Sequence, residues 1–206
     1  EDARLRLAHH GAGVVNIAAS PLVAHEFGAG FKGGLDQEEV ILQDGDLKVT
    51  AFEVDHDPIR PAVGYRFDWK GRSVVLSGDT AQSANLMENS KGADVLVAES
   101  LVPALVGMAQ QQMKAQNNPR AAKVMGDIPD YHISPVDAAK MANDAGVGLL
   151  VYSHHIPSIQ VGSPMYFAGV AAVRPADKWV AGWDGLRVDL PAGSKEIRQS
   201  ELLPKP

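Results

Sequence analysis

The sequence contains no cysteine, and that absence excludes several kinds of site at once. A chain without thiols forms no disulfide, no iron–sulfur cluster and no cysteine-ligated zinc finger, and it offers no cysteine nucleophile. Long apolar runs are also missing, since no stretch comes near the roughly 18 consecutive apolar residues that indicate a membrane-spanning helix. The sequence therefore predicts neither thiol chemistry nor a membrane partner.

Positive charge is sparse in this chain. It has 19 lysines and arginines against 25 aspartates and glutamates, a formal net charge of −6, and no run of basic residues. Proteins that bind nucleic acids neutralise phosphates with clustered lysine and arginine. The charge therefore disfavours a nucleic-acid partner.

Length and composition indicate one α/β domain. The chain has 206 residues, of which 45% are hydrophobic and 21% charged, as in an ordinary globular protein. No linker or internal repeat divides it. We expect a single domain over residues 1–206, with a core at about residues 40–190, an irregular segment 1–34 and a tail 192–206.

The pattern of turns and apolar segments predicts hairpins, followed by alternating strands and helices. Asp44-Gly45 and Lys70-Gly71 each lie between β-rich segments, as in two-residue hairpins. Ser134-Pro135 and Ser163-Pro164 have the residues of helix starts, and we expect the second of these helices to stop before Pro175. The other expected elements are helices near 83–90 and 103–116 and strands near 40–43, 47–54, 62–69, 73–76, 94–98, 147–152, 179 and 186–190.

Ionisable residues follow four of these strands at the point where each apolar run ends. In α/β sheets ligands bind beyond the carboxyl ends of the strands, so strands that share one direction would bring these residues to one edge. Histidine and aspartate together suit zinc, manganese or iron. The four endings are Asp55-His56-Asp57, Ser77-Gly78-Asp79-Thr80, Glu99-Ser100 and Ser153-His154-His155.

Each of these residues alone also has an ordinary structural explanation. Asp79 suits the N-cap of the following helix, and His56 suits a solvated turn. Glu99 suits an ion pair with a surface lysine, and His154 a surface loop. The methionines of segment 101–131 suit either a lid over a site or an ordinary core. Only the joint occurrence of the ionisable residues at four strand ends favours a site.

A linked set of short motifs runs through the chain. In order, they are Asp55-His56, residues 62–66, Val75–Thr80, Ala93–Glu99, His132 with Ser134-Pro135, and Leu150–Pro157. In this order they resemble the metallo-β-lactamase fold, and more narrowly its tRNase Z and arylsulfatase-like branch. The resemblance covers about residues 40–190 and implies an αββα sandwich of the α/β class.

The resemblance also implies a role for each of five residues. His56 would be a metal ligand, Asp79 the catalytic carboxylate that bridges two metal ions, and His154 a ligand of the second ion. His132 would be the catalytic histidine, and Glu99 the acid that orients its ring. In the complete site the resemblance implies two zinc ions, with manganese or iron as alternatives.

Two features depart from the family's pattern. The family's His-x-His-x-Asp-His motif supplies much of the metal shell, but the seven histidines here include no His-x-His pair, and His9-His10 lacks the spacing. We therefore expect a sandwich that is incomplete at its N-terminal side and a metal centre that is incomplete in this chain alone. Around the glutamate, the branch often has His-Glu-Ala-Thr where this chain has Ala98–Leu101.

Together these observations predict a metal-dependent hydrolase that uses a metal-activated water on a phosphodiester, sulfate ester or related small ester. A small-molecule ester is favoured over RNA, because the 23 residues from His56 to Asp79 leave no room for the tRNA-binding arm of bacterial tRNase Z. The alternative is a non-catalytic remnant or binding module without a complete metal centre. No serine-hydrolase elbow or convincing dinucleotide-binding motif occurs. A homodimer and the compartment, cytoplasmic or exported, are left open.

Overall fold

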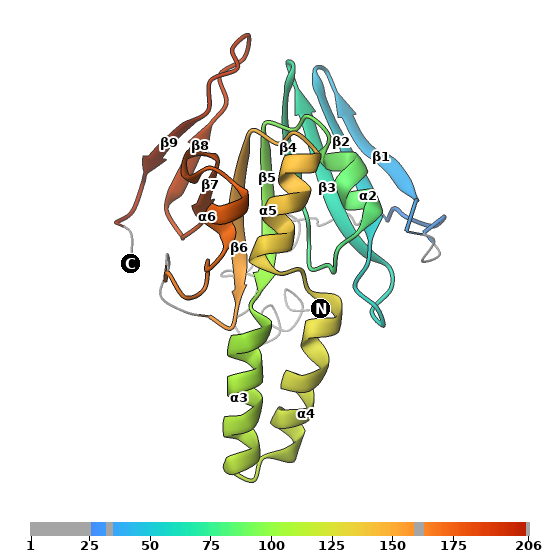
Figure 1. Ribbon diagram of the computed structural model, residues 1–206. Coiled ribbons are helices and arrows are strands. Elements are labelled where there is room, and N and C mark those ends of the chain that lie inside the picture. Colours follow the sequence, from blue (N-terminus) through green and yellow to red (C-terminus); the bar gives the residue numbers. More distant parts are fainter. Residues whose placement is uncertain (1–25, 32–34, 159–162, 205–206) are drawn as a thin grey trace, which may run out of the picture.

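The computed structural model describes residues 26–31, 35–158 and 163–204, so most of the expected irregular segment 1–34 lies outside the described residues (Figure 1). Its centre is a seven-stranded sheet in the order β1-β2-β3-β4-β5-β6-β7. The first four strands pair antiparallel and the last four parallel. The strands are β1 (Glu38–Asp44), β2 (Leu47–Val54), β3 (Ala62–Trp69), β4 (Arg72–Leu76), β5 (Val95–Leu101), β6 (Leu149–Ile156) and β7 (Trp179–Ala181).

Two tight hairpins set the strand directions. Lys70 and Gly71 both have positive φ angles, 47° and 74°, as the turn of a two-residue hairpin requires. The first turn consists of residues 45 and 46 rather than the predicted Asp44-Gly45, because Asp44 still pairs with Leu47. With these reversals, β2 and β4 point the same way as the parallel β5 and β6, so all four end at one edge. The prediction of a shared edge is confirmed.

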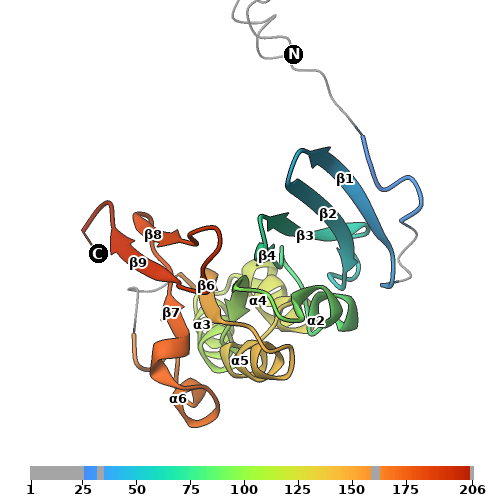
Figure 2. The ribbon, with the colours of Figure 1, turned by 90° about the horizontal axis from the view of Figure 1, so that it is seen from above.

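Helices cover one face of the sheet, and a small second sheet covers part of the other (Figure 2). Side chains alternate across a strand. Leu96 and Leu150 therefore lie in the core beneath the helices, whereas Val95 and Leu149 pack with residues of the second sheet. The covering elements are α2 (Ala84–Ser90), α5 (Pro135–Asp144), α6 (Val170–Val173), η3 (Ala176–Lys178), and the antiparallel strands β8 (Leu186–Asp189) and β9 (Arg198–Glu201). No helix among the described residues is long and apolar enough to cross a membrane.

Two segments near the C-terminus differ from the sequence-based expectation. The tail 192–206 contains β9, which no apolar pattern marks because its four residues are polar and exposed. The helix expected to start at Ser163-Pro164 is wrong over residues 164–169, which form turns and leave only the short α6. Gly169 has a φ of +88° at that boundary, a conformation that interrupts a helix.

A helical hairpin projects from the sheet on the side where β5 and β6 end (Figure 1). It consists of α3 (Pro103–Ala115) and α4 (Pro119–Asp127), followed by the 3₁₀ turn η2 (Ile128–Tyr131). The Leu101 N–H donates to the Ile133 carbonyl at 2.8 Å, so this hydrogen bond closes the base of the hairpin. Met108 is 64% exposed, which rules out the core explanation for that methionine.

Helix α5 begins with a capping arrangement that we expect to stabilise the segment after His132. Ser134 Oγ accepts from the Asp137 N–H at 3.1 Å and donates to Asp137 Oδ2 at 2.7 Å, and this hydroxyl holds the pKa of Asp137 below its usual range. Ser134→Ala should cost about 1 kcal/mol of unfolding free energy, measured by urea unfolding at neutral pH.

The sign of the pH dependence follows from the lowered pKa of Asp137. The unfolded pKa of an aspartate is about 3.9. A carboxylate whose pKa is lowered by folding stabilises the protein above that value, and this stabilisation is lost as the pH falls through the folded pKa. The difference between Ser134→Ala and the parent should therefore shrink toward acid pH. A difference that stays undiminished as the pH falls well below about 3.9 would contradict this account.

Candidate functional site

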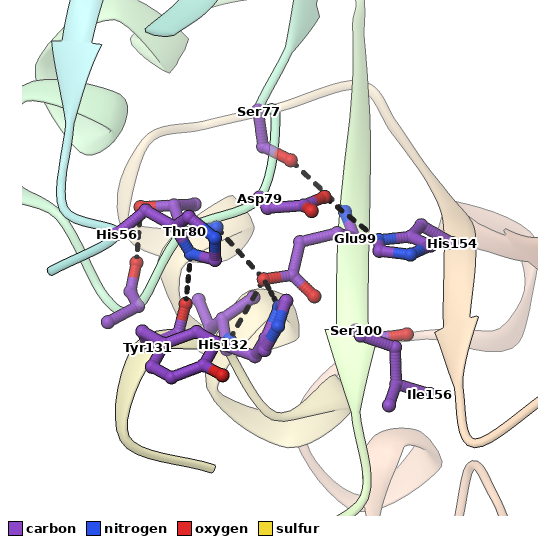
Figure 3. A network of polar contacts seen from close by, with 12 residues as sticks. His56, Ser77, Asp79, Thr80, Glu99, Ser100, Tyr131, His132, His154 and Ile156 are labelled. Carbon is purple, nitrogen blue, oxygen red and sulfur yellow. Dashed lines mark hydrogen bonds and ion pairs between the residues drawn. The ribbon is translucent and has the colours of Figure 1, made fainter. Parts of the chain in front are cut away.

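The residues singled out at the strand ends meet at one edge of the sheet (Figure 3). His56 follows β2, and Asp79 follows β4. Glu99 and His154 were expected just after their strands, but β5 and β6 continue to Leu101 and Ile156, so both residues lie inside strands. The apolar pattern ends earlier than the ladder does, which explains the difference.

Glu99 and His132 form a buried pair at the centre of this edge. His132 Nδ1 lies 2.8 Å from Glu99 Oε1, and the two side chains are 6% and 2% exposed. The same oxygen accepts the Thr80 N–H at 3.0 Å and the Ile133 N–H at 3.4 Å. A carboxylate on Nδ1 fixes that nitrogen as the donor, so Nε2 is the atom free to exchange a proton with a ligand.

The loop after β4 brings Asp79 and Thr80 beside this pair. Ser77 Oγ accepts from the Glu99 N–H at 3.1 Å, which ties the loop to β5. Gly78 has a φ of +63°, and a side chain there would place its Cβ 2.4 Å from the Val63 carbonyl oxygen. Only glycine fits this close approach to β3, so Gly78 is required for the loop's path.

His56 lies on the other side of His132, held by the segment that precedes α5. Its Nδ1–H donates to the Tyr131 carbonyl at 3.0 Å, and its ring lies edge-on to the Tyr131 ring at 4.9 Å between centroids. The His56 and His132 rings are 5.2 Å apart. This tautomer leaves His56 Nε2 with a lone pair, which is the state a metal ligand needs.

His154 contacts Asp79 from the β6 side. Its Nδ1 lies 2.8 Å from Asp79 Oδ1, with both side chains about half exposed. Its ring centroid is 6.1 Å from that of His132. The neighbouring His155 points into the core against Tyr166 and Phe167, and burial lowers its pKa. His154 rather than His155 therefore belongs to the site.

Two of the ordinary explanations are wrong. Asp79 does not cap α2, because Ser83 is the N-cap and its hydroxyl accepts from the Leu86 N–H. Glu99 is not a surface residue paired with lysine, because it is buried against His132. The geometry thus brings all five predicted residues together, while their metal-binding and catalytic roles stay predictions.

A metal site is only partly formed by these side chains. Histidine and aspartate are suitable zinc ligands, and His154 with Asp79 supplies one of each. Over residues 26–31, 35–158 and 163–204, however, no three or more histidine, cysteine, aspartate or glutamate side chains gather closely enough to hold a metal ion. The described residues therefore fit part of a donor set and do not complete one.

Sequence reasoning assigned no role to three residues that organise the site, although Thr80 was named in one of the strand endings. Thr80 provides the backbone N–H to Glu99, and Tyr131 provides the carbonyl to His56. Both directly adjoin predicted residues, so their positions next to Asp79 and His132 were an available signal. Tyr166, described below, adjoins none of them, and no local pattern marks it.

Comparison with known proteins agrees with this architecture. Residues 18–155 match the model of the β-lactamase superfamily domain. Ribonuclease Z of Mycobacterium tuberculosis (strain ATCC 25177 / H37Ra) is 32% identical over 189 residues, 92% of this chain and 61% of that protein. Ribonuclease Z of Mycobacterium avium (strain 104) is 36% identical over 148 residues, 72% of this chain and 49% of that protein. The metallo-β-lactamase fold protein YhfI from Bacillus subtilis aligns with a TM-score of 0.48 at 19% identity, covering 71% of this chain and 50% of its own.

The chain belongs to the β-lactamase superfamily, and its mixed sheet with helices on one face is consistent with the α/β architecture of the metallo-β-lactamase fold. The superfamily predicted from the linked motifs is therefore confirmed, together with the fold class, and the relatives support the tRNase Z part of the predicted branch but not its arylsulfatase-like part. The chain spans 61% and 49% of the two ribonuclease Z relatives.

Proposed function

We propose that this chain takes part in the metal-dependent hydrolysis of an ester, with a phosphodiester as the favoured substrate class. The observation that carries the proposal is the buried Glu99–His132 pair at the edge where His56, Asp79 and His154 also meet. The ribonuclease Z relatives support a phosphodiester, since they are named for cleavage of RNA.

In this proposal His132 is the general acid. As an imidazolium, His132 donates its Nδ1–H to Glu99 and can give its Nε2–H to the leaving oxygen of the ester. Glu99 holds the ring in the orientation that directs Nε2 away from the carboxylate. The Thr80 N–H in turn holds the carboxylate oxygen in place. A buried acid whose position is fixed in this way transfers its proton without a prior rearrangement.

His56, Asp79 and His154 are the residues of this chain that we propose as metal ligands, with zinc as the metal. A zinc ion, when bound, supplies an activated water at neutral pH. Because the described side chains form only part of a donor set, we derive no reaction step through the metal.

A small phosphodiester is favoured over structured RNA as the substrate. The segment between His56 and Asp79 consists of a five-residue loop, β3 and β4 with their tight turn, and two residues after β4, so it contains no long insertion that could form a projecting arm. The net charge of −6 also opposes binding of a long phosphate backbone.

A non-catalytic binding module is the second candidate. It is favoured by one observation, the lack of a three-residue metal-binding cluster among the described residues. The two candidates differ in whether added zinc produces turnover.

The test is an assay of the full chain with three substrates: bis(4-nitrophenyl) phosphate, 4-nitrophenyl sulfate and a short RNA hairpin. We expect zinc-dependent hydrolysis of the phosphodiester, loss of activity with a chelator and its return with added zinc. Faster hydrolysis of the sulfate ester or of RNA would change the substrate class. No turnover of any substrate with zinc present would favour the binding module, and turnover that resists the chelator would contradict metal dependence.

A further inference from the structure

A β-bulge places His154 at the site. On β5 and β6, Glu99 pairs with Ser153, but the next residue, Ser100, pairs with His155. His154 is thus an extra residue on β6, outside the ladder, and its φ of +43° is uncommon for a residue with a side chain. This conformation accompanies the contact of His154 with Asp79.

The hydroxyl of Tyr166 joins the two strands immediately beyond the bulge. It donates to the Ser100 carbonyl, accepts from the Ile156 N–H at 2.9 Å and lies 3.1 Å from Ser100 Oγ. A phenol has one proton to donate and two acceptor positions, so these contacts use its full capacity. Figure 3 shows Ser100 and Ile156 next to the part of β5 that carries Glu99.

Tyr166 is well suited to this connection. It is 2% exposed, and its ring packs against His155 and Phe167 at 5.3 and 4.9 Å between centroids. Burial raises the pKa of Tyr166, so the phenol keeps its proton at neutral pH. The packed ring and the protonated hydroxyl together hold the strand ends at one separation.

We propose that Tyr166 is a positioning residue whose hydroxyl fixes the bulge between β5 and β6 and thereby holds His154 against Asp79. The proposal follows from the register shift, because the hydroxyl bonds Ser100, the first residue of β5 to pair again after the bulge, and Ile156, which follows directly on the first such residue of β6. Without it, the ladder can move toward unshifted pairing, which would turn His154 away from Asp79.

The hydrogen bonds of the Tyr166 hydroxyl also affect the position of the Glu99–His132 pair. Leu101, the residue after Ser100, donates its N–H to the carbonyl of Ile133, the residue after His132. The end of β5 therefore sets the position of the segment that carries His132. The effect on hydrolysis rests on the proposed function, whereas the placement of His154 does not.

The first measurement needs no activity. Imidazole nitrogen NMR of the full chain at about pH 8.5, where histidines are neutral, reports the tautomer of each ring. The His154 signals are assigned by their loss in His154→Gln. We expect the Nδ1–H form in the parent, held by Asp79, and a shift toward the Nε2–H form in Tyr166→Phe. An unchanged His154 tautomer in Tyr166→Phe would overturn the proposal.

The matched control is Tyr152→Phe. Tyr152 is also fully buried, but its hydroxyl donates to the Pro135 carbonyl at 2.6 Å and does not bridge the strands. This variant should leave the His154 tautomer unchanged, and an equal shift in both variants would show general loosening of the core instead. If Tyr166→Phe does not fold, Ser100→Ala removes one of the three contacts and should give a smaller shift in the same direction. No shift in Ser100→Ala would then count against the proposed role of Tyr166.

The second measurement is the hydrolysis rate. We expect Tyr166→Phe to lower kcat by about 10- to 100-fold with KM nearly unchanged, and Tyr152→Phe to change neither. Equal rates for Tyr166→Phe and the parent would overturn the catalytic part of the proposal. If the parent shows no turnover, the proposed function fails, and the NMR result still decides whether Tyr166 positions His154.

Discussion

Replacing His132 with alanine is expected to slow the hydrolysis of a phosphodiester with an alkoxide leaving group by about 100- to 10,000-fold, the usual contribution of a positioned general acid. The reason is that the buried Glu99–His132 pair leaves Nε2 as the proton donor. A nitrophenolate leaves without a proton, so His132→Ala should lose far less activity on that substrate. The measurement compares kcat/KM for the two leaving groups in variant and parent.

Glu99→Gln tests the same general acid with a milder change. It keeps the size of the side chain and an oxygen for the Thr80 N–H, but it removes the charge that orients the imidazole. We expect the same dependence on the leaving group with a smaller loss. His132→Ala should also retain the parent's metal content, because His132 is not among the proposed ligands. Parental rates for His132→Ala on an alkyl diester would remove the general acid from the mechanism.

Asp94→Ala should cause the largest loss of stability. Asp94 Oδ1 lies 3.1 Å from Arg72 Nη2, and the two side chains are 10% and 3% exposed. Asp94 Oδ2 also accepts the Ser73 N–H at 2.8 Å. The substitution leaves a buried guanidinium without its carboxylate, which should cost about 3–5 kcal/mol of unfolding free energy. Urea unfolding measures this cost.

The control for Asp94→Ala is Asp46→Ala. Asp46 pairs with Lys70 at 3.8 Å on the surface, where both side chains are about half exposed or more, so its loss should matter little. Arg72 also donates to the carbonyls of Ser194 and Glu196, just before β9. Asp94→Ala should therefore speed amide hydrogen exchange in β9 more than Asp46→Ala does. Equal unfolding midpoints for the two variants would contradict the importance of the buried pair.

Much of the fold follows from the sequence because its signals are local. Lys70-Gly71 defines a hairpin by backbone preference alone, and Ser134-Pro135 defines the start of α5 by capping. β9 has no such signal, since it is a polar strand held by β8 and by the buried Arg72. The same holds for the turns at 164–169, where tertiary packing of Tyr166 prevails over the helix-start residues.

The site likewise has features that the sequence predicts and features that depend on contacts between distant segments. Polar residues after apolar strands predicted which side chains meet, because strand direction alone brings them to one edge. What the pattern leaves out is the register. The bulge that frees His154 and the hydroxyl of Tyr166 that bonds across it depend on contacts between segments far apart in the chain. Neither leaves a trace in the spacing of residues along one strand.

The hydrogen bond between Leu101 and Ile133 has a consequence for how this chain tolerates change. It fastens both ends of the α3–α4 hairpin next to the residues that matter, Glu99 on one side and His132 on the other. The turn between α3 and α4 can then vary in length at little cost in stability, because each doubling of a flexible loop costs only about 0.6 kcal/mol. Insertions and deletions at the tip, near Asn117, would thus be inherited without disturbing the proton donor. Among related chains, the α3–α4 hairpin is therefore where we expect differences in length.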